Sequence, residues 1–144
     1  MHDSKKLILS GCLIINEKKE ILLLFKKNHQ HYETPGGKVD PSDCEDYPDL
    51  TLEDLRKTAE RETFEELGDS IELAPLTYFR TVEFTIPDGR KAVAHKFITK
   101  IVKGEPLVAE PKIFSKLDWL PLAKLDSFPI SPDLKLLQDR LKSY

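Results

Sequence analysis

The sequence predicts an α+β domain, and three observations carry that prediction. Two apolar runs rich in β-branched residues, 7–15 and 20–25, are typical of strands. Two further β-rich runs, 77–86 and 91–102, flank a strong hairpin turn signal. Apolar residues then recur at helical spacing in two segments, one of which ends the chain.

Composition indicates one globular domain over residues 1–144, with 40% hydrophobic and 33% charged residues. The net charge of −3 disfavours binding of long nucleic acid, whereas a small anionic ligand neutralised by metal is compatible with it. No apolar run is long enough to span a membrane, so we expect a cytoplasmic protein, monomeric or homodimeric. Neither cysteine has zinc spacing; Cys12 is expected to be buried and Cys44 to be a loop thiol.

The first two runs are expected to pair as a hairpin of buried strands, because only residues 16–19 separate them. The polar loop that follows carries His29, His31 and Tyr32 just before a glycine pair. Tyr32 could stack on a base and either histidine could contact that base. A structural role for Tyr32 and a solvated loop position for each histidine are the alternatives.

The central helix is expected to begin at Thr51 or Asp54, since either can cap it, and to end at Gly68. Its expected packed side carries Leu55, Ala59 and Leu67. The C-terminal helix is expected to follow Ser131 as its cap, with Pro132 at its first position. Its expected packed side carries Leu134, Leu137 and Leu141.

Three carboxylates crowd one turn of the central helix. Glu62, Glu65 and Glu66 fall within an arc of roughly 100° on one face. Their repulsion calls for Lys or Arg partners or for a hard divalent cation, which carboxylate oxygens bind well. A solvated acidic face is the alternative.

A glycine turn precedes this helix in the sequence. Gly36 and Gly37 permit backbone conformations closed to other residues and a close approach to a ligand. Lys38 adds a positive charge beside them. A glycine loop before an acidic helix suits a metal-bound phosphate.

These residues together resemble the signature of the Nudix hydrolases, G-x5-E-x7-R-E-U-x-E-E-x-G-U with U apolar. The matching residues are Gly37, Glu53 and, seven residues later, Arg61-Glu62-Thr63-Phe64-Glu65-Glu66-Leu67-Gly68. Between Gly37 and Glu53 the chain carries a longer acidic segment than the family's five residues, which we interpret as an insertion that includes residues 40–50. Thr63 and Asp69 replace apolar residues, while every charged position is intact.

The resemblance implies a Nudix-type α/β/α sandwich with a mixed β-sheet, a catalytic helix after the Gly-Gly loop and a C-terminal helix. It implies Mg²⁺, or Mn²⁺, held by Gly37, Glu62, Glu65, Glu66 and Glu110. The catalytic set it implies is Glu65, Glu66, Glu110, Arg61 and Glu53. Within that set Glu66 or Glu110 accepts the proton, and Glu53 and Arg61 support the loop and helix, with a surface ion pair as the alternative. The expected substrate contacts are Lys38, Tyr32, Arg80 and His31.

Glu110 is assigned from the segment Glu110-Pro111-Lys112, which lies upstream of Trp119. It is similar to a Glu-Pro-x-Lys segment common in Nudix enzymes that act on nucleoside triphosphates. Because Lys112 stands one residue early, Glu105 and Glu83 are kept as substitutes, and a plain loop acid is the alternative.

The substrate implied by the resemblance is a small nucleotide. ADP-ribose and dinucleoside polyphosphate enzymes of the family carry a Pro or a Tyr where this chain has residues 83–85, Glu-Phe-Thr. Hydrolysis of a nucleoside triphosphate to monophosphate and pyrophosphate is therefore expected. Cleavage of an ADP-sugar or another NDP-X compound, and a non-catalytic nucleotide-binding domain, are the alternatives.

Overall fold

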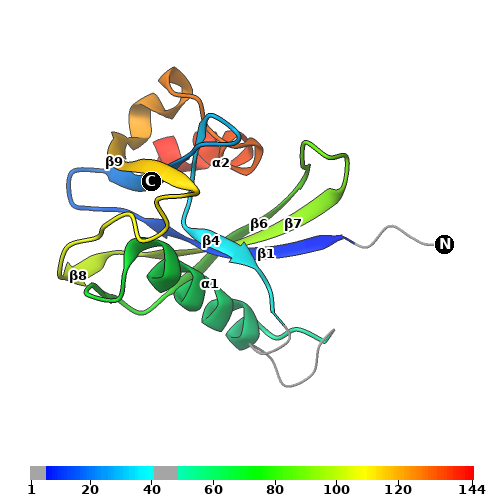
Figure 1. The fold of residues 1–144 in the computed structure, drawn as a ribbon, viewed down its shortest axis with the longest axis horizontal. Helices are drawn as coiled ribbons and strands as arrows, with labels where there is room; N and C mark the ends of the chain where they lie inside the picture. Colours follow the sequence, from blue (N-terminus) through cyan, green and yellow to red (C-terminus); the bar gives the residue numbers. More distant parts are fainter. Residues whose placement is uncertain (1–5, 41–48) are drawn as a thin grey trace.

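The computed structural model describes residues 6–40 and 49–144 (Figure 1). The acidic insertion expected at residues 40–50, including Cys44, lies largely outside the described residues. The strands are β1 (Leu7–Ile14), β2 (Glu20–Lys26), β3 (His31–Glu33), β4 (Gly36–Lys38), β5 (Glu72–Leu73), β6 (Thr77–Thr85), β7 (Lys91–Thr99), β8 (Ile101–Lys103) and β9 (Phe114–Pro121). The helices are α1 (Leu52–Leu67), the 3-10 helix η2 (Leu122–Ser127) and α2 (Pro132–Lys142).

The main sheet has the order β4-β1-β7-β6, and a second sheet has the order β3-β2-β9. Because β1 and β7 run parallel whereas the other pairs of the main sheet are antiparallel, the predicted mixed sheet is confirmed. The predicted hairpin of β1 and β2 is wrong. The two strands join through a tight turn but pair only at the bridge Ile15↔Ile21, and each then continues into a different sheet.

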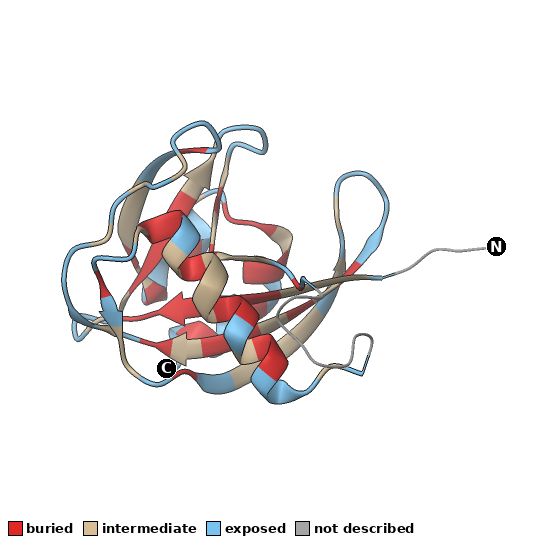
Figure 2. Cartoon of the chain, turned by 60° about the horizontal axis from the view of Figure 1, so that its bottom comes forward, coloured by how far each residue is buried: buried red, intermediate tan, exposed pale blue. Residues whose placement is uncertain are grey.

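Strand alternation divides the core into two layers. Cys12 and Ile14 of β1 pack in the cluster that includes α1 residues, whereas Leu13 packs in the cluster that includes α2 residues. In β2, Leu22 and Leu24 face the first cluster and Leu23 the second. Each of the two strands is therefore buried on both faces (Figure 2), and α1 covers one side of the strands whereas α2 covers the other (Figure 1). The expected α/β/α sandwich is confirmed.

Helix α1 begins and ends where the sequence indicates. Thr51 is the N-cap, and both expected capping residues act together, since the Thr51 hydroxyl accepts from the Asp54 N–H while the Asp54 carboxylate accepts from the Thr51 N–H. Gly68 ends the helix at a φ of +88°, which disfavours other residues. Thr63 is fully buried where the family has an apolar residue, and its hydroxyl donates to the Ala59 carbonyl at 2.7 Å. That hydrogen bond satisfies its polar group inside the core.

The remaining elements follow the expected pattern with two differences. The turn after β6 is closed by the Ile86 N–H, which donates to the Arg90 carbonyl at 2.9 Å. The run 91–102 is interrupted at Lys100, which separates β7 from β8. Ser131 occupies the N-cap of α2, but its side chain makes no capping hydrogen bond. Among the described residues, no helix is long and apolar enough to cross a membrane.

Candidate active site

The site is built where β4 passes between β1 and α1. Gly36 pairs with Gly11 of β1, and a Cβ on Gly36 would lie 2.6 Å from the Gly11 Cα. A Cβ on Gly37 would overlap the carboxylate of Glu62. The two glycines therefore let the β4 backbone approach one neighbour on each side, a strand and a helical carboxylate.

Glu66 is the most deeply buried of the helical glutamates, at 6% exposure. One of its oxygens accepts a hydrogen bond of 3.2 Å from the Gly36 N–H. Burial raises the pKa of Glu66 to about 9; the Gly36 N–H opposes this shift, and the charges of Glu62, Glu110 and Glu33 add to it. In the absence of a cation this carboxyl holds a proton at neutral pH.

Glu62 shares that environment. Burial raises its pKa as well; the charge of Arg61 opposes the shift, whereas the charges of Glu65 and Glu110 add to it. Glu110 reaches the site because its loop is tied to the end of α1, where the Ala109 N–H donates to the Glu66 carbonyl at 3.0 Å. The charge of Glu110 is among the causes that raise the pKa of Glu62 and Glu66, so the place of Glu110 in the site stays a prediction that this arrangement favours.

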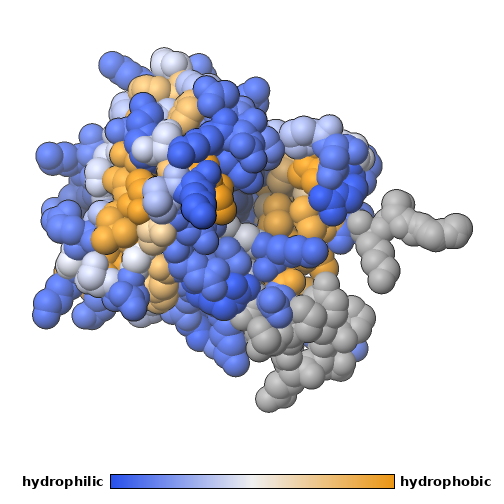
Figure 3. All heavy atoms as spheres, in the orientation of Figure 1, coloured by the Kyte–Doolittle hydropathy of each residue, from blue (hydrophilic) through white to orange (hydrophobic). Residues whose placement is uncertain are grey.

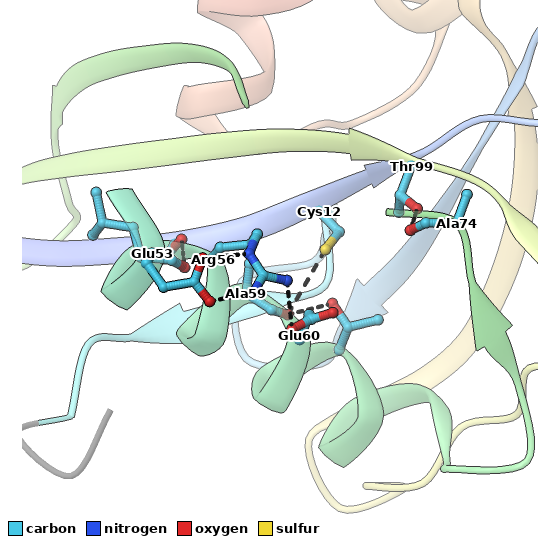
Figure 4. Close-up of polar contacts among 10 residues, drawn as sticks. Cys12, Glu53, Arg56, Ala59, Glu60, Ala74 and Thr99 are labelled. Atoms are coloured by element: carbon cyan, nitrogen blue, oxygen red, sulfur yellow. Dashed lines mark hydrogen bonds and ion pairs between the residues drawn. The ribbon is translucent and has the colours of Figure 1, made fainter. Parts of the chain in front are cut away.

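Arg61 connects the acidic face to the glycine turn. Its guanidinium donates to Glu62 at 2.9 Å, to Glu65 at 3.1 Å and to the Lys38 carbonyl at 3.4 Å. This agrees with its expected support of loop and helix. Glu53 instead pairs with Arg56, which also binds Glu60 at 3.1 Å on the outer face of α1 (Figure 4). For Glu53 the structure favours the surface ion pair.

A cavity of about 500 Å³ opens beside β4. Gly36, Gly37 and Lys38 line it together with Leu7 and Leu9 of β1 and Phe84 and Ile86 of the β6–β7 hairpin. Figure 3 shows apolar residues exposed between this hairpin and the rest of the molecule, with hydrophilic side chains around them. The glycines that contact the carboxylates thus also border a space of the size of small-molecule sites.

A sequence model of one protein family matches nearly the whole chain. It is described as the NUDIX domain, and it covers residues 7–140. The chain belongs to the NUDIX family. The resemblance found in residues 37–68 is confirmed, and the protein is a Nudix hydrolase. Among curated proteins, a search found no match to this sequence.

Solved structures agree with this assignment. The MutT NUDIX hydrolase from Burkholderia pseudomallei superposes with a TM-score of 0.77 at 27% identity, over 94% of this chain and 98% of that one. The MutT protein from Methanosarcina mazei Go1 has a TM-score of 0.74 at 23% identity, over 99% and 97% of the two chains. The NUDIX domain of Shewanella oneidensis NrtR, complexed with ADP ribose, has a TM-score of 0.68 at 20% identity, over 99% and 91%.

The glutamates of this Nudix hydrolase form a donor set that fits a hard divalent cation. Glu62, Glu65, Glu66 and Glu110 offer oxygen ligands alone. Burial and the charges of neighbouring glutamates raise the pKa of Glu62 and Glu66, which indicates an excess of negative charge there. Because Gly37 has no side chain, the Glu62 carboxylate lies directly against the β4 backbone. A divalent metal, which Nudix hydrolases generally use, would offset that excess charge.

The expected substrate contacts separate into two groups. His31 and Lys38 line the cavity. Tyr32 is only 5% exposed; its ring packs edge-on against Phe25 and Phe128, and its hydroxyl donates to Asp118 at 2.7 Å. The structural role is therefore the correct alternative for Tyr32, because its ring belongs to the core.

Three other expected residues lie apart from the cavity. Arg80 lies on β6 opposite Lys96 and is not among the described residues that line the cavity. Glu83 pairs with Lys6 at 3.0 Å, and the Glu105 carbonyl accepts from Ser70. Glu110 is favoured over both as a member of the metal site, because its charge is among the main causes that raise the pKa of Glu62 and Glu66.

Sequence reasoning missed a buried ion pair in the cavity wall. Lys96 donates to Thr34 at 2.7 Å and pairs with Asp133 at 2.6 Å, and both charged residues are below a tenth exposed. Burial by itself raises the pKa of Asp133. The charge and the hydrogen bond of Lys96 lower it, and the net pKa lies below the ordinary value. One signal was available, because Lys96 follows Ala92 and Ala94 at the inward positions of β7.

Proposed function

We propose that this Nudix hydrolase cleaves a nucleoside triphosphate to the monophosphate and pyrophosphate, with Mg²⁺ as its cofactor and Mn²⁺ as a substitute. The observation that carries the proposal is that Glu66 accepts from the Gly36 N–H and the Glu62 carboxylate lies against Gly37, in the glycine turn that borders the cavity. Triphosphate would meet the carboxylates through the metal while the nucleoside enters the cavity.

The residues that would hold the metal are the Gly37 carbonyl, Glu62, Glu65, Glu66 and Glu110. Bound there, Mg²⁺ would neutralise phosphate charge, polarise the phosphorus centre and lower the pKa of water. Arg61 fixes the carboxylates of Glu62 and Glu65 and ties them to the Lys38 carbonyl. Because these carboxylates are already held together in the folded protein, substrate binding needs no further free energy to bring their like charges together.

Glu66 and Glu110 are the candidates to accept the proton of the attacking water. Glu66 is held by the Gly36 N–H, and a bound cation would lower its pKa and so make its carboxylate available as a base. Glu110 has a more open position on the loop after β8. Lys38, exposed at the cavity edge, can contribute charge to the phosphates.

The choice of a triphosphate has two supports. The Glu110-Pro111 segment resembles that of triphosphate enzymes in the family, and a structure of the same fold at 27% identity is a MutT NUDIX hydrolase. An NDP-X substrate is the second candidate, because the similar NrtR domain is complexed with ADP ribose and another similar structure is a UDP-X diphosphatase. Both candidates use the same cleavage of a pyrophosphate bond.

A hydrolysis panel with Mg²⁺ tests the proposal. It should contain ordinary and oxidised nucleoside triphosphates, ADP-ribose, NADH and dinucleoside polyphosphates, with products separated by ion-exchange chromatography. Monophosphate plus pyrophosphate from a triphosphate is the expected result. Two monophosphate products from an NDP-X compound would replace the triphosphate by an NDP-X compound as the substrate. Mg²⁺-dependent turnover no higher than that of a Glu65→Gln control would refute the proposal.

A further inference from the structure

A second group of potential metal ligands lies on β3 and the turn before it, outside the α1 helix. His31 and Glu33 are two residues apart on β3, so their side chains leave the same face of the strand. Tyr32 between them points into the core. The turn before β3, where Gln30 has a φ of +53° and its N–H donates to the Lys26 carbonyl at 2.8 Å, brings His29 back over that face.

The ligand atoms of these three residues converge. His31 Nε2 lies 2.6 Å and His29 Nδ1 lies 3.4 Å from the same Glu33 oxygen, Oε2. All three ligand atoms lie within 4.8 Å of one another. The Lys26 ammonium is 4.0 Å from the other Glu33 oxygen, Oε1, so it leaves the His-facing oxygen available.

These distances are close to those of a tetrahedral metal centre. With metal–ligand bonds of about 2.0–2.2 Å, neighbouring ligand atoms of a tetrahedral zinc site are roughly 3.3 Å apart. The distance of 3.4 Å between His29 Nδ1 and Glu33 Oε2 matches this spacing. His31 Nε2 lies 2.6 Å from the same oxygen and would have to move away from it by less than the length of one metal–ligand bond. Rotation of side chains at a partly exposed cluster can supply that movement.

The donor atoms differ in kind from those on α1. The α1 set contains oxygen atoms alone and suits Mg²⁺, whereas two imidazole nitrogens with one carboxylate suit zinc and its neighbours in the first transition row. We propose that His29, His31 and Glu33 form a second metal site, for Zn²⁺ or a similar divalent transition metal. The fourth position of the metal is left to solvent or to a ligand.

The site faces the same cavity as the glycine turn. His29, His31 and Glu33 line it together with Gly37 and Lys38. A cation bound by three protein ligands, only one of them anionic, brings net positive charge to this wall, where an anionic ligand can occupy its open position. The binding claim is independent of the proposed hydrolysis, because it concerns residues other than the α1 glutamates.

Calorimetric titration with Zn²⁺ tests the inference without substrate. Millimolar Mg²⁺ occupies oxygen-only sites, and a Cys44→Ser background removes the thiol of the acidic segment. One Zn²⁺ per chain is expected to bind. His29→Ala and His31→Ala should each weaken Zn²⁺ binding more than the loss of a residue that only hydrogen-bonds to a metal ligand, which typically costs about 10–100-fold in affinity. Because His29 is exposed, His29→Ala is the variant that should leave the fold intact.

Two matched variants separate this site from other sources of binding. His95→Ala removes a histidine that bonds Thr81 on β6, and Glu65→Gln alters the α1 set; both should bind Zn²⁺ as the parent does. Co²⁺ added in place of Zn²⁺ should show visible absorption of a low-symmetry site in the parent and lose it in His29→Ala. Zn²⁺ binding that survives the double variant His29→Ala/His31→Ala, or that is absent from the parent, would overturn the inference.

Discussion

The α1 carboxylates of Glu62 and Glu66 and the carboxylates in the cavity wall, Glu33 and Asp133, have opposite pKa shifts. On the α1 side, burial raises the pKa of Glu62 and Glu66, and neighbouring glutamates add to both shifts. On the cavity side, burial by itself also raises the pKa of Glu33 and Asp133, but His31 and Lys26 lower the first and Lys96 the second, and each net pKa falls. Burial therefore gives opposite outcomes, because the carboxylates on the cavity side have enough cationic partners to outweigh it.

The comparison separates two kinds of charged site. The α1 side has more negative charge than its protein partners offset, which is the condition under which a divalent cation stabilises a fold and its substrate complex. The cavity side neutralises its carboxylates with protein groups. Each prediction below removes a group from one side and asks whether the contrast holds.

The largest expected effect is on turnover. Glu65→Gln keeps the shape of an exposed side chain on α1 but removes one charge from the metal-binding set. We expect kcat to fall on the order of 10⁴-fold, because metal ions supply several kcal/mol of transition-state stabilisation. Glu60→Gln, on the same helix but paired with Arg56, is the control and should keep parental turnover. Equal rates in the two variants would contradict the assignment.

Breaking the cavity-side ion pair should cost stability. Lys96→Met leaves Asp133 buried without its cation, and we expect the free energy of unfolding to fall by about 3–5 kcal/mol. Lys96→Met/Asp133→Asn should recover most of that loss, since it removes the unpaired charge as well. Urea denaturation followed by circular dichroism measures both. A loss below about 1 kcal/mol in the single variant would show that the pair is not needed to neutralise Asp133.

Glu66→Gln should stabilise the metal-free enzyme. Between its ordinary pKa of 4.5 and its folded pKa of about 9, Glu66 keeps a proton in the folded state that the unfolded chain releases. The parent therefore loses stability as pH rises through that window, while Gln titrates in neither state. We expect the variant to gain on the order of 3 kcal/mol at pH 7, and more at pH 9. Thermal unfolding in a chelator across this pH range would reveal a parallel pH dependence if the prediction is wrong.

The smallest expected effect concerns the glycine turn. In Gly37→Ala the new methyl displaces the Glu62 carboxylate, which can swing away, so we expect unfolding free energy to change by less than about 1 kcal/mol. Mg²⁺ should bind about tenfold more weakly, because one ligand is moved. Gly36→Ala is the contrasting variant, since its methyl meets the Gly11 backbone and should destabilise the fold. Calorimetry with Mg²⁺ on the folded Gly37→Ala protein decides between the two effects.

Local patterns explain which parts were predictable. Three glutamates on one helical face, a cap at Thr51 and an end at Gly68 depend on a few neighbouring residues, and all appear as expected. The misassigned β1–β2 pair shows the limit of that reasoning. Both strands are apolar on two faces, so neither alternation nor the short turn distinguishes a shared sheet from two sheets.

The sequence by itself determined the family, the mixed sheet between two helical layers and the acidic face of α1, because helical period and motif spacing are properties of the chain. Only the tertiary structure decided that Glu66 meets Gly36 and that Lys96 neutralises Asp133. These partners are 30 or more residues apart in the sequence, and their meeting depends on how the layers pack. It also decided that Tyr32 is core and that His29, His31 and Glu33 share one face.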